Sequence, residues 1–147
     1  MNLHEKAAKG LLKGEILTIE ILNQRDIAGR TVWHVAAQNK TFNSMPKELL
    51  TEEVLNETNA FQNTVWHIAA VGGSLNAIPE HLFTEKALNQ RNMFGETVWQ
   101  RMGEFKTLNQ LPKKFISEKL LQMKYDSGKK IFGRINTKYK QCFTNAC

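Results

Sequence analysis

Two histidines stand in surroundings that could support chemistry. His34 and His67 each lie three residues after a threonine, in the phrase Thr-Val-Trp-His. An imidazole beside a hydroxyl group is the pairing that general-base and nucleophilic catalysis use. The two phrases lie 33 residues apart, however, and a catalytic residue has no reason to recur at a fixed step. We therefore expect both histidines to have a structural role.

The remaining polar residues do not combine into a catalytic site. The pair Gly72-Gly73 lacks the following lysine of a phosphate-binding loop. His4 and His81 have no partners at a matching spacing. No stretch brings together a nucleophile, a base and a group that orients the base. The sequence therefore predicts a protein that is not an enzyme and that uses no cofactor.

The two cysteines, Cys142 and Cys147, both lie in the last six residues. Their spacing fits no zinc motif, so we expect no metal site and interpret them as free thiols of a reducing compartment. No apolar run approaches the roughly 20 residues of a membrane helix, and the first residues do not resemble a signal peptide. We expect a cytoplasmic protein without membrane association, or one in a host-cell cytosol if it is an effector.

The chain repeats itself with a period of 33 residues. The phrase Thr-Val-Trp begins at Thr31, Thr64 and Thr97, and prolines and leucines recur at the same step. A fixed period of this length indicates an array of stacked units that share one core. We therefore predict one all-α domain over residues 1–147. Its parts are an N-terminal cap with the first turn at 1–30, repeats at 31–63, 64–96 and 97–129, and a basic C-terminal tail at 130–147.

Each unit reads as two short helices and a turn. Thr64 suits the N-cap of the first helix, and Gly72-Gly73 suits its end. Pro79 suits the first turn of a second helix, because a first-turn N–H has no helical partner to lose. The stretch 89–95 is rich in turn formers. The buried side of the second helix would come from Leu82, Phe83 and Leu88.

Three tryptophans recur at one position of the repeat, as Trp33, Trp66 and Trp99. An exposed row of this kind could stack nucleic-acid bases. Their place in the phrase that opens each helix favours the core between repeats instead, where each would bury a large apolar area and need a partner for its indole N–H.

On these residues the chain resembles the ankyrin repeat family, whose 33-residue unit opens with Thr-Pro-Leu-His-x-Ala-Ala. The chain departs from that phrase at Val65 and Trp66, and Gln100 replaces the histidine of the third unit. The resemblance covers about residues 15–130 and implies a helix-turn-helix repeat solenoid with helical caps at both ends. It also implies that the histidine bridges the threonine hydroxyl and the neighbouring turn. The matching residues of the second unit are Thr64, His67, Ala69, Ala70, Gly73, Asn89 and Gly95.

The resemblance further implies a binding face, because turn tips and the exposed side of the first helix line a concave surface in this family. Several residues there are apolar where a solvated surface would be charged, and such patches usually mark interaction sites. We predict a non-catalytic module that binds a folded partner protein, as an adaptor or inhibitor, with self-association also possible. Alternatively, the phenylalanines fold onto the neighbouring turns as a local staple. The face comprises Ile27, Arg30, Gln38, Asn39, Phe61, Asn63, Val71, Met93, Phe94, Glu96 and Phe105.

The net charge of +6 is unevenly distributed. Residues 1–112 hold 11 basic and 12 acidic side chains, whereas residues 113–147 hold nine basic and two acidic ones. The basic end could contact nucleic acid or another anionic surface, which is the alternative function. The simpler interpretation is a solvated cap that keeps the open end of the array soluble. The candidate contacts are Lys113, Lys114, Lys124, Lys129, Lys130, Arg134, Lys138 and Lys140.

Overall fold

The structure is a computed structural model that describes residues 1–115. This part of the chain contains α-helices and 3-10 turns without any β-strand, so the fold is all-α. None of its helices is long and apolar enough to cross a membrane. Lys113 and Lys114 lie in the last 3-10 turn, Lys113–Phe115. The rest of the predicted C-terminal cap and tail lies outside the described residues, together with Lys124, Lys129, Lys130, Arg134, Lys138 and Lys140.

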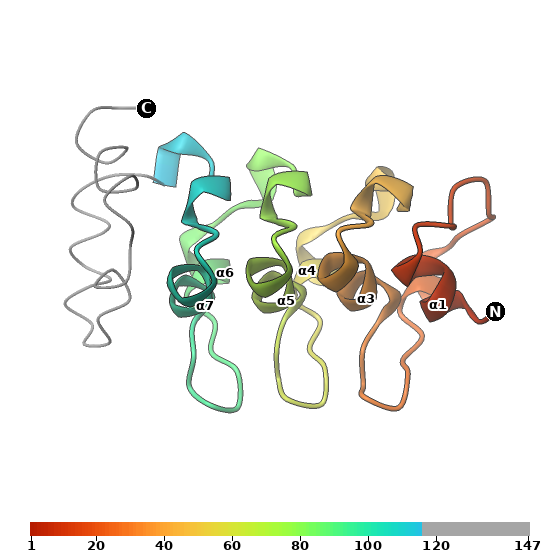
Figure 1. The fold of residues 1–147 in the computed structure, drawn as a ribbon, viewed down its shortest axis with the longest axis horizontal. Coiled ribbons are helices and arrows are strands. Elements are labelled where there is room, and N and C mark those ends of the chain that lie inside the picture. Colours follow the sequence, from red (N-terminus) through yellow and green to blue (C-terminus); the bar gives the residue numbers. More distant parts are fainter. Residues whose placement is uncertain (116–147) are drawn as a thin grey trace.

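Four helices lie side by side in a row (Figure 1): α1 (Leu3–Ala8), α3 (Val32–Asn39), α5 (Val65–Gly72) and α7 (Val98–Phe105). Each contacts the next helix in the row. A threonine hydroxyl caps each of the last three helices, as the repeated phrase predicts, by accepting the amide N–H three residues later. The three helices end at residues in the left-handed conformation, Lys40, Gly73 and Lys106.

A second helix is present, but the prediction that it starts at Pro79 is wrong. In the middle unit the segment forms two 3-10 turns, Leu75–Ala77 and Glu80–Leu82, and only then the short helix α6 (Glu85–Leu88). Pro79 disfavours a helical conformation at Ile78, which is extended with ψ 130°. Thr84 then caps a new helix through its hydroxyl. The other units contain equivalent helices, α2 (Ile19–Leu22) and α4 (Glu52–Asn56), also capped by threonines.

The core lies where the helix row packs against the segments that follow each of its helices, and Trp33, Trp66 and Trp99 are buried in it as predicted. Trp66 packs edge-on against Phe83, with 4.8 Å between the ring centroids. No described residue accepts a hydrogen bond from the buried indole N–H of Trp33 or Trp66. Among residues 1–115 the expected indole partner is therefore absent for Trp33 and Trp66, whose rings lie in the apolar core.

Hydroxyl groups join each unit to the one before it. Ser74 and Thr107 donate hydrogen bonds to the carbonyl oxygens of Ala37 and Ala70, near the C-terminal ends of α3 and α5. Thr41 makes the equivalent bond to α1. Because serine and threonine recur here at the 33-residue step, the same backbone atom is reached in each unit.

Gly72 has a different role from the one predicted for it. We expected both glycines to end the helix, but only Gly73 adopts the left-handed conformation, with φ 78°. A Cβ atom on Gly72 would lie 2.6 Å from the Ala37 carbonyl oxygen and 3.0 Å from that of Gln38. The absence of a side chain at Gly72 therefore lets α5 approach the backbone of α3.

Candidate protein-binding face

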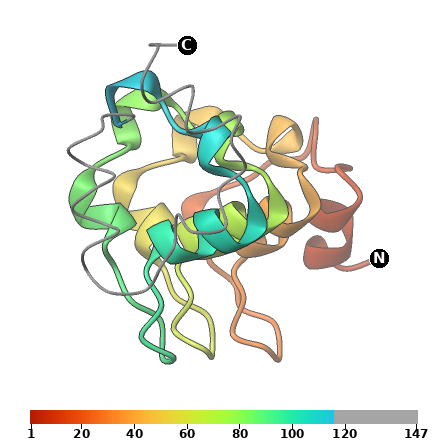
Figure 2. The same cartoon turned by 60° about the vertical axis from the view of Figure 1, so that its left-hand side comes forward.

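Three hairpin loops project from one edge of the helix row (Figures 1 and 2), at residues 26–30, 59–63 and 92–96, and we call them the hairpin row. Asp26, Asn59 and Asn92 begin the three loops. In the third, the Asn92 side-chain oxygen accepts the amide N–H groups of Phe94 and Glu96, both at 3.0 Å. The first two loops contain the same pair of bonds. Each loop is therefore held by its own first side chain.

The fourth residue of each loop has a positive φ: 71° at Gly29, 60° at Gln62 and 74° at Gly95. Glycine adopts this conformation without strain, whereas Gln62 does so at some cost. A Cβ atom on Gly29 would also lie 2.9 Å from the Ala60 amide nitrogen. Glycine at position 29 thus lets the first two hairpins approach each other.

Neighbouring hairpins are joined through their backbones. The Ala60 N–H donates to the Ala28 carbonyl at 3.1 Å, and the Met93 N–H donates to the Phe61 carbonyl at 3.0 Å. The Asn92 side-chain amide also donates to the Asn63 side-chain oxygen at 2.9 Å. The three loops therefore form one connected row.

The two repeated histidines fix this row to the helices. His67 Nε2 lies 2.9 Å from the Glu96 carbonyl in the next hairpin, and its Nδ1 accepts the Thr64 N–H at 3.1 Å. His34 makes the same contacts with the Asn63 carbonyl and Thr31. Because a carbonyl only accepts hydrogen bonds, Nε2 carries the proton and Nδ1 is the acceptor.

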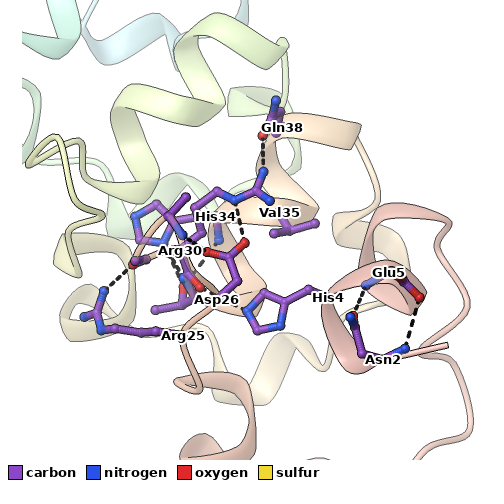
Figure 3. Close-up of polar contacts among 12 residues, drawn as sticks. Asn2, His4, Glu5, Arg25, Asp26, Arg30, His34, Val35 and Gln38 are labelled. Carbon is purple, nitrogen blue, oxygen red and sulfur yellow. Dashed lines mark hydrogen bonds and ion pairs between the residues drawn. The ribbon is translucent and has the colours of Figure 1, made fainter.

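His4 makes the same type of contact from the first helix, although no partner was predicted for it. Its Nε2 lies 3.0 Å from the Arg30 carbonyl (Figure 3). Asn2 and Glu5 supply the capping bonds of α1 in place of threonine and histidine. Since the separation between His4 and Arg30 is 26 residues, against 29 in the two repeats, a search at the fixed period misses it.

Burial keeps both repeated histidines neutral. It lowers the pKa of His34 from 6.5 to about 4, and the positive charges of Arg25 and Arg30 add to this effect. Burial also lowers the pKa of His67. A buried, neutral imidazole whose two nitrogens are both hydrogen-bonded suits a structural joint.

We expect the protein to lose stability between pH 6.5 and pH 4. In this window His34 of the unfolded chain takes up a proton that the folded chain excludes, so stability is full above pH 6.5 and falls as the pH is lowered. The loss from this residue is on the order of 3 kcal/mol at pH 4. Urea unfolding at half-unit pH steps measures it. The His34→Gln variant is the control, because it should show a smaller slope, and an equal slope in both proteins would contradict the assignment.

The tips of the hairpin row are apolar and exposed. Phe61 and Phe94 are stacked with ring centroids 6.2 Å apart and an interplanar angle of 23°, yet they remain 50% and 65% exposed. Ile27 and Met93 are also exposed. The local contact between the phenylalanines therefore forms, but it leaves half or more of each side chain accessible. We call Phe61 and Phe94 the aromatic pair.

In comparisons with known proteins, no family model and no curated protein matches the chain.

The other residues of the predicted face fall into two groups. Gln38, Asn39 and Phe105 are exposed at the C-terminal ends of α3 and α7. Val71, at the same end of α5, is half-buried. The remaining three, Arg30, Asn63 and Glu96, are half-buried and brace the hairpins.

The bracing contacts are side-chain hydrogen bonds within and between units. Arg30 Nε donates to the Asp26 carboxylate at 2.7 Å, and its Nη1 donates to Gln38 at 3.1 Å (Figure 3). Glu96 accepts from the Asn92 amide at 3.0 Å and from Arg101 at 3.3 Å. These residues therefore shape the face and are less available to a partner than the tips.

Two arginines that the sequence analysis did not single out also hold the hairpins. Arg25 donates to the Gly29 carbonyl at 2.7 Å and pairs with Glu57, and Arg91 donates to the Gly95 carbonyl at 2.6 Å. Thr58 occupies the equivalent position in the middle unit, so the 33-residue step does not reveal them. Within residues 1–115, no three His, Cys, Asp or Glu side chains lie close enough together to hold a metal ion.

Proposed function

We propose that the protein is a non-catalytic, ankyrin-type repeat module that binds a folded partner protein through its hairpin tips and the adjoining ends of the first helices. The carrying observation is the aromatic pair, Phe61 and Phe94, exposed side by side at the tips of neighbouring hairpins. Binding would occlude the partner's surface, so an inhibitor or an adaptor is the expected role.

The ankyrin-type assignment is supported by three features that recur at the 33-residue step. They are the Thr-capped first helix, the histidine contact with the neighbouring turn, and a hairpin loop that joins one unit to the next. The broken second segment departs from the helix-turn-helix expectation. The 3-10 turns that break this segment lie on the side of the helix row opposite the hairpins (Figure 1), so they do not alter the proposed face.

We expect the tip side chains to be dispensable for folding of the hairpins. The loops are held by the Asx side chains, by backbone bonds and by the positive-φ residues. Phe61 and Phe94 contact each other, and an aromatic stack of this kind stabilises by about 1 kcal/mol. This stacking energy alone does not explain why so much apolar surface is exposed. Exposed apolar patches usually mark interaction sites, and aromatic side chains are typical of hot spots at protein interfaces.

Hydrogen bonds already hold the face together before binding. Backbone bonds link the hairpins to one another, and the histidines link them to the helices. A face that is already ordered loses little conformational entropy when a partner docks, which favours affinity.

The double variant Phe61→Asp/Phe94→Asp is expected to fold normally and lose partner capture. Removing two aromatic anchors and adding two charges should weaken binding by at least about 30-fold. The measurement is affinity capture from lysate of the native source, with circular dichroism and melting temperature as folding checks. Leu11→Asp/Ile16→Asp is the matched control, because Leu11 and Ile16 are exposed apolar residues outside the face.

Each alternative has its own signature in this experiment. Capture that persists in the double variant but disappears after nuclease treatment would contradict the proposal and favour nucleic-acid binding by the basic C-terminal residues. A captured protein identical to the bait would instead mean self-association. Capture by the double variant equal to wild type would exclude the aromatic pair as the binding site.

A further inference from the structure

One backbone donor in the first loop of the hairpin row has no acceptor among the residues that the structure describes. Ala60 and Met93 occupy the same position in the second and third hairpins, and each donates its amide N–H to the preceding hairpin. Ile27 is the equivalent residue of the first hairpin. No described residue accepts a hydrogen bond from its N–H. The Ile27 N–H therefore does not make the hydrogen bond that joins the other hairpins to one another.

The side chain of Ile27 is also exposed to solvent. It is fully exposed, at 108%, and is the most exposed of the large apolar residues among positions 1–115. In Figure 1 the first hairpin ends the row on the side of α1. The Ile27 N–H and the Ile27 side chain thus lie together on an edge that no residue among 1–115 covers.

We propose that this edge docks an exposed turn of a partner protein, which accepts a hydrogen bond from the Ile27 N–H through a backbone carbonyl and covers the Ile27 side chain. The inference rests on the proposed function in using the hairpin row for binding. It adds a second contact, distinct from the aromatic pair, and the kind of partner element that fits it.

The chain itself shows which element fits. At both internal joints the acceptor is a carbonyl at the tip of a hairpin, that of Ala28 or Phe61, and the N···O distances are 3.1 and 3.0 Å. A partner turn at Ile27 would continue the same contact by one step.

Proline has no backbone N–H, so a proline at position 27 tests the contribution of this donor to binding. Gly29 N–H bonds to the Asp26 carbonyl, so Asp26–Gly29 is a β-turn whose second residue is Ile27, a position that proline favours. Ile27→Pro should remove the donor and leave the melting temperature within about 1 °C of wild type. The matched control is Ala60→Pro, which deletes a donor already bonded to Ala28 and should lower it by about 5 °C.

The probe is a head-to-tail cyclised peptide reproducing Gln90–Val98, which presents the Phe94 carbonyl at the equivalent tip position. It is titrated to about 5 mM into the 15N-labelled full chain, a range suited to weak single-turn contacts. The Ile27 amide resonance should shift most. Ile27→Pro, followed through the Ala28 and Gly29 amides, should weaken binding at least about tenfold. Ile27→Ala, which retains the N–H, should weaken it less.

Three results would overturn the proposal: no shift at Ile27, equal binding by the Ile27→Pro variant, or Ile27 shifts that grow with protein concentration alone, which would assign the edge to a second copy. The Phe61→Asp/Phe94→Asp variant separates this inference from the proposed function. It should still bind the peptide at Ile27 even if capture of the partner is lost.

Discussion

Replacing Gly72 with valine is expected to destabilise the protein by at least about 4 kcal/mol. The new Cβ would lie 2.6 Å from the Ala37 carbonyl oxygen and 3.1 Å from Gln38 Cα, both of which are backbone atoms. Backbone atoms cannot move aside as a side-chain end can, so α5 and α3 must separate. Overpacking typically costs about 1–3 kcal/mol, and a branched residue against backbone exceeds that range. Separation also breaks the hydroxyl bond from Ser74 to Ala37.

For the milder change Gly72→Ala, helix propensity alone predicts a gain in stability, because alanine is favoured over glycine in a helix by about 1 kcal/mol. The contact geometry predicts a loss for alanine as well. Chemical denaturation of wild type, Gly72→Ala and Gly72→Val tests this order. Asn39→Val at the equivalent position of α3 is the control, since Asn39 is exposed and should change stability little. If the valine variant unfolds at the wild-type midpoint, the close approach of α5 to α3 is wrong.

Replacing His67 with alanine is expected to destabilise the protein by about 4 kcal/mol. The change leaves the Glu96 carbonyl and the Thr64 N–H without their partner, and each buried unpaired group costs about 1–3 kcal/mol. A cavity in place of a fully buried ring adds to the loss. Because His67 joins one unit to the hairpin of the next, the melting temperature should fall without a selective loss of partner binding below the transition.

Glutamine at the same position should be tolerated better than alanine. Gln100 already occupies this position in the third unit, where its side-chain oxygen accepts the Thr97 N–H at 2.7 Å. His67→Gln should therefore retain the capping bond and lose the bridge to Glu96. His81→Ala is the control, because His81 is an exposed histidine whose removal should matter by less than about 0.5 kcal/mol. Wild-type stability in the His67→Ala protein would refute a structural role.

The features that could be predicted from the sequence are local and periodic. Thr31, Thr64 and Thr97 cap helices because the cap depends on residues three apart, and the turns follow from Asn and Gly chemistry. The second segment was predicted wrongly because Pro79 suits both a first helical turn and a break. Only Thr84, which starts a new helix, separates the two possibilities.

The features that could not be predicted depend on contacts between units. Gly72 reads as a helix stop until the backbone of α3 is placed against it. Arg30 and Glu96 read as binding residues, but their side chains reach Asp26 and Arg101. In the same way, a tip position indicates exposure, but the amount left after Phe61 and Phe94 stack depends on their rotamers and on the spacing of the hairpins.

The joints between units have a consequence for how such a chain can diversify. The histidine, hydroxyl and hairpin-amide bonds all end on main-chain carbonyl oxygens, which every amino acid carries. Substitutions at the tips therefore leave the acceptors in place. The exposed side chains at the tips, such as those of Phe61 and Phe94, can therefore change while these joints remain intact. Under the proposed function, the choice of partner could then evolve separately from the stability of the array.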